Sequence, residues 1–485
     1  MSDFSVKIIP TPKSISTGGV TYVLPTVRAA AKYSDSRSVL TDYVKRIFDV
    51  TLSAGDAITL SDDPTLGAGE YRIEITSGAA NLYASDTDGM GYAVATLVQL
   101  IEKDGDRISL PTACITDRPD CSFRAFMVDL ARKWHPFECV LAYVDLCYLY
   151  KIKFLHLHFI DTQSYTLPSD KFPKMPTPDR HYTREEIAKL NAYAASRGIE
   201  LIPEMEVPGH AAAMVGAYPE LFADTPVGAD TVDTYSLFNN TQKRNIICVG
   251  KPGVMDTLRT LAEEIIEMFP NSRYLHIGGD EAKISDWGNC RDCLEYMKQN
   301  GIEGPKPLYT HFVKKMTDMV LELGKTPMVW EGFPRDGADE ISRDVIVTAW
   351  ESYYHLAPEL IAEGFKITNS SWQPLYIVPA GHRYVTSGHW EPEEILDWNI
   401  YNWQNWNPKT AAYQNPINVE PCDSVLGATL CAWECTYEQE IEPVKRNLAA
   451  MSERVWNVSS TPDKTAFLAA LDRLVAIAEK LLPQV

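Results

Sequence analysis

Apolar and polar residues follow two different periods along this chain. From residue 121 onward, short apolar runs of strand-forming residues alternate with stretches whose apolar residues recur at helical spacing, about eight times in all. The helix after Thr183 is the clearest, because Thr183 and Glu186 form a capping box and Gly198 follows its last turn. The predicted strands are residues 125–130, 154–161, 200–207, 274–279, 327–331, 345–351, 366–370 and 424–433.

Strands and helices that alternate in this way predict an α/β fold, a (β/α)8 TIM barrel whose parallel strands end at the active site. Residues 1–120 instead combine short strand-like runs, such as 71–76, with one helical stretch at 91–102, which predicts a small α/β domain. The turn-forming sequence Asp-Arg-Pro-Asp at 117–120 marks the boundary. We therefore expect the barrel at 121–485, with a terminal helix at 464–482.

The net charge of −20 narrows the class of partner. It argues against nucleic acid and against an anionic membrane surface, because both require clustered basic residues. No run of about twenty apolar residues is present, and the first residues lack the pattern of a signal peptide. These features predict a soluble protein of the cytoplasm that acts on a neutral or small ligand. An exported form stays open if a leader has been removed, and the oligomeric state is not indicated.

The ten cysteines show no disulfide framework. Several, such as Cys147 and Cys431, lie inside apolar runs, which is typical of reduced thiols that pack as small hydrophobic residues. Cys290 and Cys293 have the spacing of a metal or redox pair, but no second pair accompanies them. We interpret them as loop thiols, with a disulfide as the alternative after export.

The main candidate for a catalytic site is the stretch of residues 273–282, Arg-Tyr-Leu-His-Ile-Gly-Gly-Asp-Glu-Ala. The apolar start predicts a buried strand, and Gly278 and Gly279 allow a ligand or another backbone to approach closely. Asp280 and Glu281 then follow at the end of the strand, where the regular pleat breaks up and both carboxylates can reach one pocket. The alternative is a solvated acidic turn that caps the next helix.

The same stretch resembles the hallmark His-x-Gly-Gly-Asp-Glu of the β-N-acetylhexosaminidases of glycoside hydrolase family 20. The resemblance implies an exo-acting, retaining enzyme that removes terminal GlcNAc or GalNAc without a metal or organic cofactor. It also implies that Glu281 is the general acid and base, and that Asp280 holds the acetamido group while the substrate's own carbonyl oxygen attacks to form an oxazolinium intermediate. Asp161 and His210 would support Asp280. We expect burial and the charge of Asp280 to raise the pKa of Glu281.

The resemblance extends along residues 121–435 and implies a set of sugar-binding side chains. Arg124, five residues before Asp129, resembles an arginine of the family that binds sugar hydroxyls; the alternative is a structural ion pair with Asp129 or another barrel acid. Val378 departs from the family, which has an acidic residue there. The remaining predicted sugar-binding residues are Trp330, Trp350, Tyr376, Trp433 and Glu434.

Three other functions stay open at this point. A glycosidase with two catalytic carboxylates could pair Glu281 with Glu331 or Glu434, and it would not need a 2-acetamido group. A binding protein descended from an enzyme would hold sugar without turnover. A metal-dependent barrel hydrolase would use the side chains that share its typical ligand types, namely His156, His158, His210, His276 and Asp280. Two long loops, 218–243 and 380–423, are expected to decide linkage preference.

Overall fold

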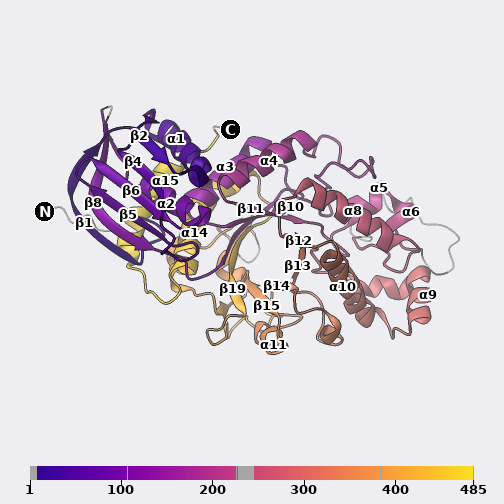
Figure 1. Ribbon diagram of the computed structural model, residues 1–485. Coiled ribbons are helices and arrows are strands. Elements are labelled where there is room, and N and C mark those ends of the chain that lie inside the picture. Colours follow the sequence, from indigo (N-terminus) through magenta and orange to yellow (C-terminus); the bar gives the residue numbers. More distant parts are fainter. Residues whose placement is uncertain (1–7, 106, 226, 228–244, 383–384, 484–485) are drawn as a thin grey trace.

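The computed structural model describes residues 8–105, 107–225, 227, 245–382 and 385–483. A small domain at the N-terminal end of the chain lies beside a larger barrel (Figure 1). Most of the predicted loop 218–243 lies outside the described residues. In the part of the chain that is described, no helix has the length and apolar character needed to cross a membrane.

Eight parallel strands close into a barrel, as the sequence predicts. Each strand pairs with the next along the chain, and the last pairs with both the seventh and the first. Because helices cover the outside and side chains fill the inside, the strands are buried on both faces and read as continuous apolar runs. In order they are β9 (Phe123–Asp129), β10 (Phe154–His158), β11 (Glu200–Glu204), β12 (Tyr274–His276), β13 (Thr326–Trp330), β14 (Ile346–Ala349), β15 (Lys366–Asn369) and β19 (Val425–Ala432).

Helices follow these strands and cover the barrel. The predicted capping box is present at the start of α4, where the Thr183 side chain accepts from the Glu186 N–H and the Glu186 carboxylate accepts from the Thr183 N–H. The short strand β16 (Tyr376–Ile377) pairs with β19 after the seventh strand. The main helices of the barrel are α3 (Phe137–Leu149), α4 (Arg184–Ser196), α8 (Val254–Met268), α10 (Pro305–Glu322), α11 (Ala357–Ala362), α13 (Pro392–Asp397) and α14 (Tyr437–Trp456).

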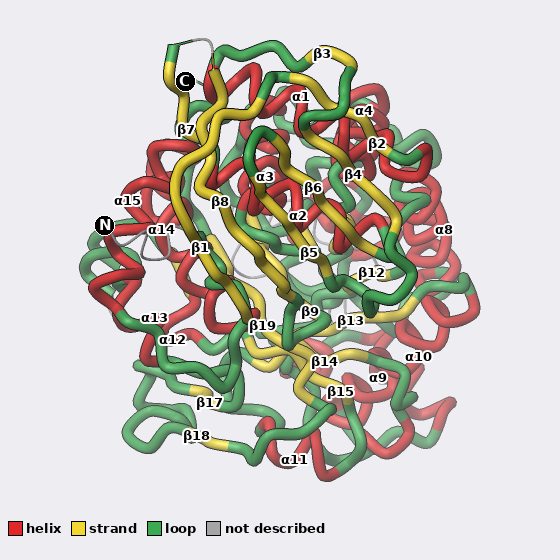
Figure 2. Tube along the Cα trace, turned by 60° about the vertical axis from the view of Figure 1, so that its left-hand side comes forward, coloured by secondary structure: helices red, strands yellow, loops and turns green. Residues whose placement is uncertain are grey.

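The small domain is a mixed sheet with helices on one face (Figure 2). Helix α2 (Thr87–Leu100) packs between the sheet and α3, and Asp86 caps it by accepting from the Gly89 N–H at 2.7 Å. The predicted strand 71–76 is β5 (Tyr71–Thr76). The other elements are β1 (Ser14–Val23), β2 (Thr26–Ala29), α1 (Ser34–Phe48), β3 (Ser53–Ala54), β4 (Ile58–Asp62), β6 (Ala79–Ala84), β7 (Glu102–Asp104) and β8 (Arg107–Asp117).

The C-terminal helix of the chain contacts the small domain as well as the barrel. Helix α15 (Lys464–Ala478) begins where the sequence predicts it, and Arg473 donates from its guanidinium to the carbonyl oxygens of Gln99 and Ile101 in the small domain. The terminal helix therefore belongs to the contact between the domains as well as to the barrel.

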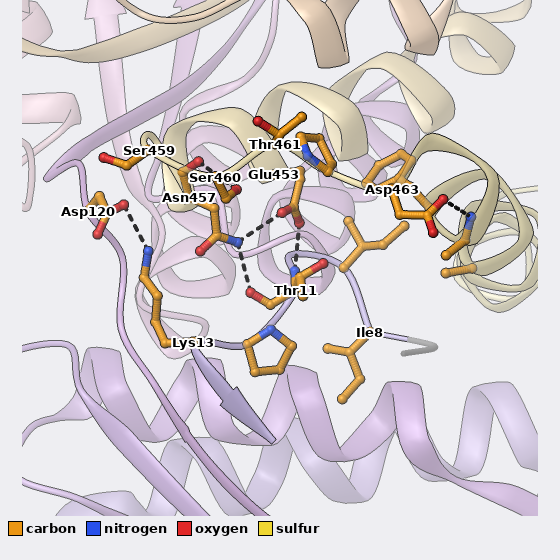
Figure 3. Close-up of a pocket in the computed structure, with 16 residues that line it drawn as sticks. Ile8, Thr11, Lys13, Asp120, Glu453, Asn457, Ser459, Ser460, Thr461 and Asp463 are labelled. Atoms are coloured by element: carbon orange, nitrogen blue, oxygen red, sulfur yellow. Dashed lines mark hydrogen bonds and ion pairs between the residues drawn. The ribbon is translucent and has the colours of Figure 1, made fainter. Parts of the chain in front are cut away.

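A groove of about 490 Å³ lies between the first described residues and the segment that joins α14 to α15 (Figure 3). Its polar groups bind one another: the Asn457 side chain donates to the Thr11 carbonyl at 2.8 Å, and the Thr11 N–H donates to Glu453 at 2.6 Å. Lys13 and Asp120 form an ion pair at 2.8 Å. Although it is larger than the cavity described below, this groove lies between the domains, and its contacts hold the chain ends together.

Candidate active site

A second cavity, of about 260 Å³, opens where the barrel strands end. This is the position at which TIM barrels carry their active sites. It brings together both carboxylates of the Gly-Gly-Asp-Glu sequence and five of the other residues that the sequence marks as candidates. The lining residues are Arg132, Asp280, Glu281, Trp330, Trp350, Glu351, Trp372, Tyr376, Val378, His382, Asn405, Trp406, Asn407, Trp433 and Glu434.

The two glycines after β12 shape the turn that delivers the carboxylates. Gly278 and Gly279 have φ angles of +69° and +97°, a region that favours glycine. A Cβ atom on Gly278 would lie 1.9 Å from the carboxylate of Glu206, which is itself buried and accepts from the Gly279 N–H at 3.0 Å. Glycine at both positions therefore lets a buried carboxyl group of the neighbouring strand end support the turn.

Asp280 and Glu281 lie in the same cavity but in different surroundings. Asp280 is 8% exposed, and its Oδ1 is buried without a hydrogen-bond partner among the described residues. The Glu281 side chain is half exposed, and its backbone has a φ of +45°. Because a non-glycine residue rarely adopts such a φ, the local backbone is strained, which is a common property of active sites. The arrangement leaves one carboxylate oxygen of Asp280 ready to accept a hydrogen bond from a ligand.

Two basic side chains, His210 from the loop after β11 and Arg132 from the loop after β9, lie beside these carboxylates. His210 Nδ1 lies 3.4 Å from Asp161 Oδ1, and His210 Nε2 lies 3.4 Å from Glu281 Oε2 and 3.9 Å from Asp280 Oδ2. Arg132 binds Asp161 at 2.8 Å. The predicted grouping of Asp161 and His210 with the carboxylate pair is therefore present in the structure, but His210 approaches Glu281 more closely than Asp280.

The charges around His210 set the pKa values of the site. Burial alone would lower the pKa of His210, but the charge of Asp161 and hydrogen bonds to Asp161 and Glu281 raise it well above its ordinary value. The imidazole of His210, 3.4 Å from the Glu281 carboxylate, lowers the pKa of Glu281, and this effect exceeds the opposing effect of burial. Burial raises the pKa of Asp280. Our expectation of a raised pKa for Glu281 was wrong, because it considered burial and Asp280 but omitted a protonated imidazole at hydrogen-bond distance.

Aromatic side chains form one wall of the cavity. The rings of Trp350 and Tyr376 are parallel within 2° at a centroid distance of 6.2 Å, and Trp372 stacks on Tyr376 at 4.8 Å. The ring centroids of Trp330 and Trp433 lie 5.7 Å apart. The predicted residues Trp330, Trp350, Tyr376 and Trp433 thus share one surface, which is suited to the apolar face of a sugar ring.

Arg124 does not line this cavity, and its prediction as a sugar-binding residue was wrong. It is the second residue of β9, at the opposite end of the barrel, and its guanidinium donates to the carbonyl oxygens of Lys151 and Cys121 and to the hydroxyl of Tyr92. The alternative ion pair with Asp129 is not formed either. Asp129 instead binds Arg132 at 3.3 Å.

The candidate metal ligands separate into two groups. His156, His158 and His276 surround the buried carboxylate of Glu204, with nitrogen to oxygen distances of 2.8, 2.7 and 3.3 Å. His210 and Asp280 are the other two, and their side-chain ligand atoms lie within 4.8 Å of each other and of the Glu281 carboxylate. The five predicted ligands therefore do not converge on one point. The first three orient Glu204, which also accepts from the Trp330 indole at 2.7 Å.

Sequence reasoning missed two charged residues of the cavity. Arg132 lies three residues beyond the end of β9, and a basic residue in this loop next to Asp129 was an available signal. Glu351 follows Trp350 at the end of the sixth strand, and burial together with the charge of Glu281 raises its pKa to about 8. Its position after a predicted cavity tryptophan could also have been noticed.

The chain matches two family models. Residues 121–459 match the model described as glycosyl hydrolase family 20, catalytic domain, and residues 5–118 match the model of glycosyl hydrolase family 20, domain 2. The first match covers the whole barrel and every residue of the cavity.

Characterised relatives and solved structures agree with these matches. The chain is 30% identical over 343 residues to a beta-hexosaminidase of Vibrio furnissii, a match that spans 66% of the chain and 54% of that protein. It is 32% identical over 288 residues to a beta-hexosaminidase of Akkermansia muciniphila, over 56% of the chain and 57% of that protein. The matches thus cover little more than half the length of these relatives.

The fold is shared with solved structures at lower identity. The exo beta-N-acetylglucosaminidase of Vibrio harveyi in complex with N-acetylglucosamine has a TM-score of 0.80 at 23% identity, over 98% of this chain and 77% of that one. The beta-N-acetylhexosaminidase of Streptomyces coelicolor has a TM-score of 0.75 at 23% identity, over 99% of this chain and 98% of that one.

Proposed function

Because the chain belongs to glycosyl hydrolase family 20, we propose that it is an exo-acting, retaining β-N-acetylhexosaminidase. It removes terminal β-linked GlcNAc or GalNAc from a carbohydrate. The observation that supports this most directly is the free Oδ1 of Asp280, which is buried beside the aromatic wall and without a hydrogen-bond partner among the described residues. Such an oxygen requires a donor from the ligand, and an acetamido N–H supplies one.

The mechanism assigns a different task to each carboxylate. Asp280 accepts the acetamido N–H and turns the carbonyl oxygen toward the anomeric carbon, while Tyr376 donates to that oxygen. Glu281 donates a proton to the leaving oxygen as the carbonyl oxygen attacks, which gives an oxazolinium intermediate. Water then opens this intermediate with Glu281 as the base, and two inversions give net retention. Intramolecular attack of this kind can lower the barrier by about 7–11 kcal/mol.

The cavity is suited to a single terminal sugar. Its volume of about 260 Å³ is enclosed by strand-end residues, with Val378, His382 and Trp406 in the wall. Val378 replaces the acidic residue that binds sugar hydroxyls in the family, so recognition on that side depends on other groups of the wall. Glu434 lies at the exposed rim, where it can bind a hydroxyl.

The structure weakens the alternative of a two-carboxylate glycosidase. Glu331 is 1% exposed, and its carboxylate accepts the backbone N–H groups of Ser352 and Tyr353 at 2.9 and 2.7 Å. Those bonds make Glu331 a support for the loop after β14, so it is a poor nucleophile. Glu434 remains available as a partner for Glu281, and the alternative needs an experiment.

Comparison of two aryl glycosides tests the proposal. We expect rapid hydrolysis of an aryl N-acetyl-β-glucosaminide and none of the aryl β-glucoside that lacks the acetamido group, since only the first carries its own nucleophile. Initial rates measured under the same conditions decide this. Comparable cleavage of both substrates would indicate a protein nucleophile or an activated water and would contradict the proposal.

The charge on His210 leads to a prediction about pH dependence. Protonated His210 lowers the pKa of both Glu281 and Asp280. In His210→Asn both values rise, so the whole pH profile of kcat/KM, which reports the ionisation of the free enzyme, should move to higher pH. We expect the maximum rate to fall about 10- to 100-fold, as for loss of other orienting groups.

Measurement of kcat/KM from acidic to alkaline pH checks this prediction. His311→Asn is a matched control, because His311 lies on α10, binds Tyr296 and does not line the cavity. A pH profile that stays in place or moves to lower pH in His210→Asn would show that His210 does not set the ionisation of the two carboxylates.

We also propose that the protein acts in the cytoplasm. None of the ten cysteines forms a disulfide in the structure, which is consistent with the reducing environment of the cytoplasm. A count of free thiols in protein isolated from its native source would test this assignment.

A further inference from the structure

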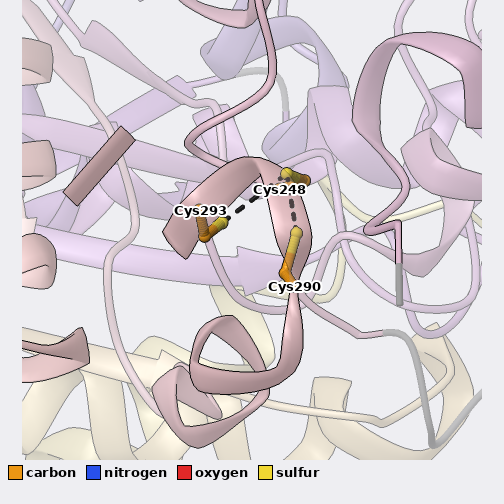
Figure 4. Close-up of side chains that lie close together, drawn as sticks. All are labelled: Cys248, Cys290 and Cys293. Atoms are coloured by element: carbon orange, nitrogen blue, oxygen red, sulfur yellow. Dashed lines mark hydrogen bonds between the residues drawn. The ribbon is translucent and has the colours of Figure 1, made fainter. Parts of the chain in front are cut away.

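Three cysteines from two segments that are distant in the sequence meet in the barrel domain (Figure 4). Cys248 Sγ lies 3.3 Å from Cys290 Sγ and 3.6 Å from Cys293 Sγ, and all three side chains are fully buried. The sequence indicated that Cys290 and Cys293 are unaccompanied loop thiols. The structure corrects this, because the third sulfur comes from a residue 42 positions before Cys290.

The distances exclude a disulfide and fit three sulfur ligands of one metal ion. A disulfide requires about 2.05 Å between its sulfur atoms. Thiolates bound to zinc at about 2.3 Å in a tetrahedron lie about 3.8 Å apart, close to the observed separations. Elsewhere in the described chain, buried cysteines such as Cys139, Cys147 and Cys431 do not gather in threes.

The segments that carry Cys248 and Cys293 pack closely against each other. A Cβ atom on Gly250 would lie 2.6 Å from the Cα of Cys293, so glycine is needed for the two segments to approach.

We propose that Cys248, Cys290 and Cys293 bind one Zn²⁺ ion, with a solvent molecule as the fourth ligand. Binding releases three thiol protons and leaves three thiolates on the ion. Zinc suits this donor set because it prefers sulfur ligands, adopts tetrahedral geometry and does not change oxidation state. The ion is structural, since none of the three cysteines lines the catalytic cavity.

The site joins two loops at the carboxyl ends of neighbouring strands. The segment with Cys248 is bonded to the loop after β11 through the Ile247 N–H and the Pro208 carbonyl, at 3.0 Å. The segment with Cys290 begins at Asp280 and continues through the 3₁₀ helix η3 (Ile284–Asn289) into α9 (Arg291–Asn300). Trp287 adds a bond from its indole to the Ile247 carbonyl at 2.9 Å. Zinc would hold the loop that carries Asp280 and Glu281 against the segment that carries Cys248.

Metal analysis of the full-length protein, purified without added metal and without chelator, tests the proposal. We expect about one zinc per chain in the wild type and about a tenth or less in Cys248→Ser and Cys290→Ser. Cys147→Ser is the matched control, because Cys147 is equally buried in α3 but belongs to no group of three possible metal ligands among the described residues, and it should retain the zinc. A wild type without zinc, or zinc kept in both site variants, would overturn the proposal.

Thiol titration of the wild type keeps the test independent of whether the variants fold. In denaturant without chelator, zinc release should accompany the reaction of the thiols, and all ten cysteines should react without a reductant. Two fewer reactive thiols that return on reduction would show a disulfide in place of the ion and would overturn the site. Ten reactive thiols with no metal released would do the same.

Discussion

Glu281→Gln should slow hydrolysis of substrates with poor leaving groups by about 10²–10⁴-fold, the range that general acid catalysis contributes. Glutamine cannot donate the proton that an alkoxide leaving group needs. A dinitrophenolate leaves without protonation, so the first step on a dinitrophenyl substrate should be slowed far less. The side chain is half exposed and its carboxylate contacts His210 at the cavity mouth, so the substitution should not unfold the barrel.

Rates of Glu281→Gln and wild type on two aryl N-acetyl-β-glucosaminides, with methoxyphenyl and dinitrophenyl leaving groups, check this. Glu295→Gln is the control, because Glu295 lies on α9, binds Gln299 at the surface and is absent from the cavity. Equal losses on both substrates would remove Glu281 from the role of general acid.

The barrel could be predicted because its strands and helices carry their own signals. Strands buried on both faces appear as apolar runs such as Phe154–His158, and helices carry caps such as Thr183. The C-terminal contact with the small domain had no such signal. Arg473 binds two backbone carbonyl oxygens there, and nothing in a sequence shows which carbonyls a distant arginine will meet.

The two arginines near the first strand show where reasoning from a motif failed. Arg124 and Asp129 lie on one strand, and five residues of strand span about 16 Å, so the two side chains lie at opposite ends of the barrel. The predicted fold already implied this separation. Arg132, in the loop after the same strand, is the arginine that can reach Asp161 and the cavity.

The ionisation of the carboxylates could not be inferred from their adjacency. Asp280 and Glu281 are neighbours in sequence, but the turn after Gly279 buries one and exposes the other. Only the fold places His210, from the loop after β11, at 3.4 Å from Glu281. The pKa of Glu281 therefore falls in the free protein, and a bound sugar that excludes water from the cavity must raise it again before it can act as an acid.

Asp280→Asn should slow hydrolysis by about 10²–10³-fold, a loss typical of removing one preorganised electrostatic contact to the transition state. Asparagine can still accept the acetamido N–H, but it lacks the negative charge that stabilises the developing positive charge on the acetamido group. Asp280 acts on the acetamido group and does not contact the leaving oxygen. The loss should therefore be similar on dinitrophenyl and methoxyphenyl substrates, in contrast to Glu281→Gln.

Stability separates this loss from unfolding. Asp280 is buried among carboxylates, and its charge raises the pKa of Glu206 and Glu351. Neutral asparagine removes that repulsion, so Tm should stay the same or rise while activity falls, as expected for a group kept for function at the expense of stability. Asp286→Asn, in the same loop but paired with Lys283 outside the cavity, is the control. A lowered Tm, or a loss confined to poor leaving groups, would contradict the role of Asp280 in holding the acetamido group.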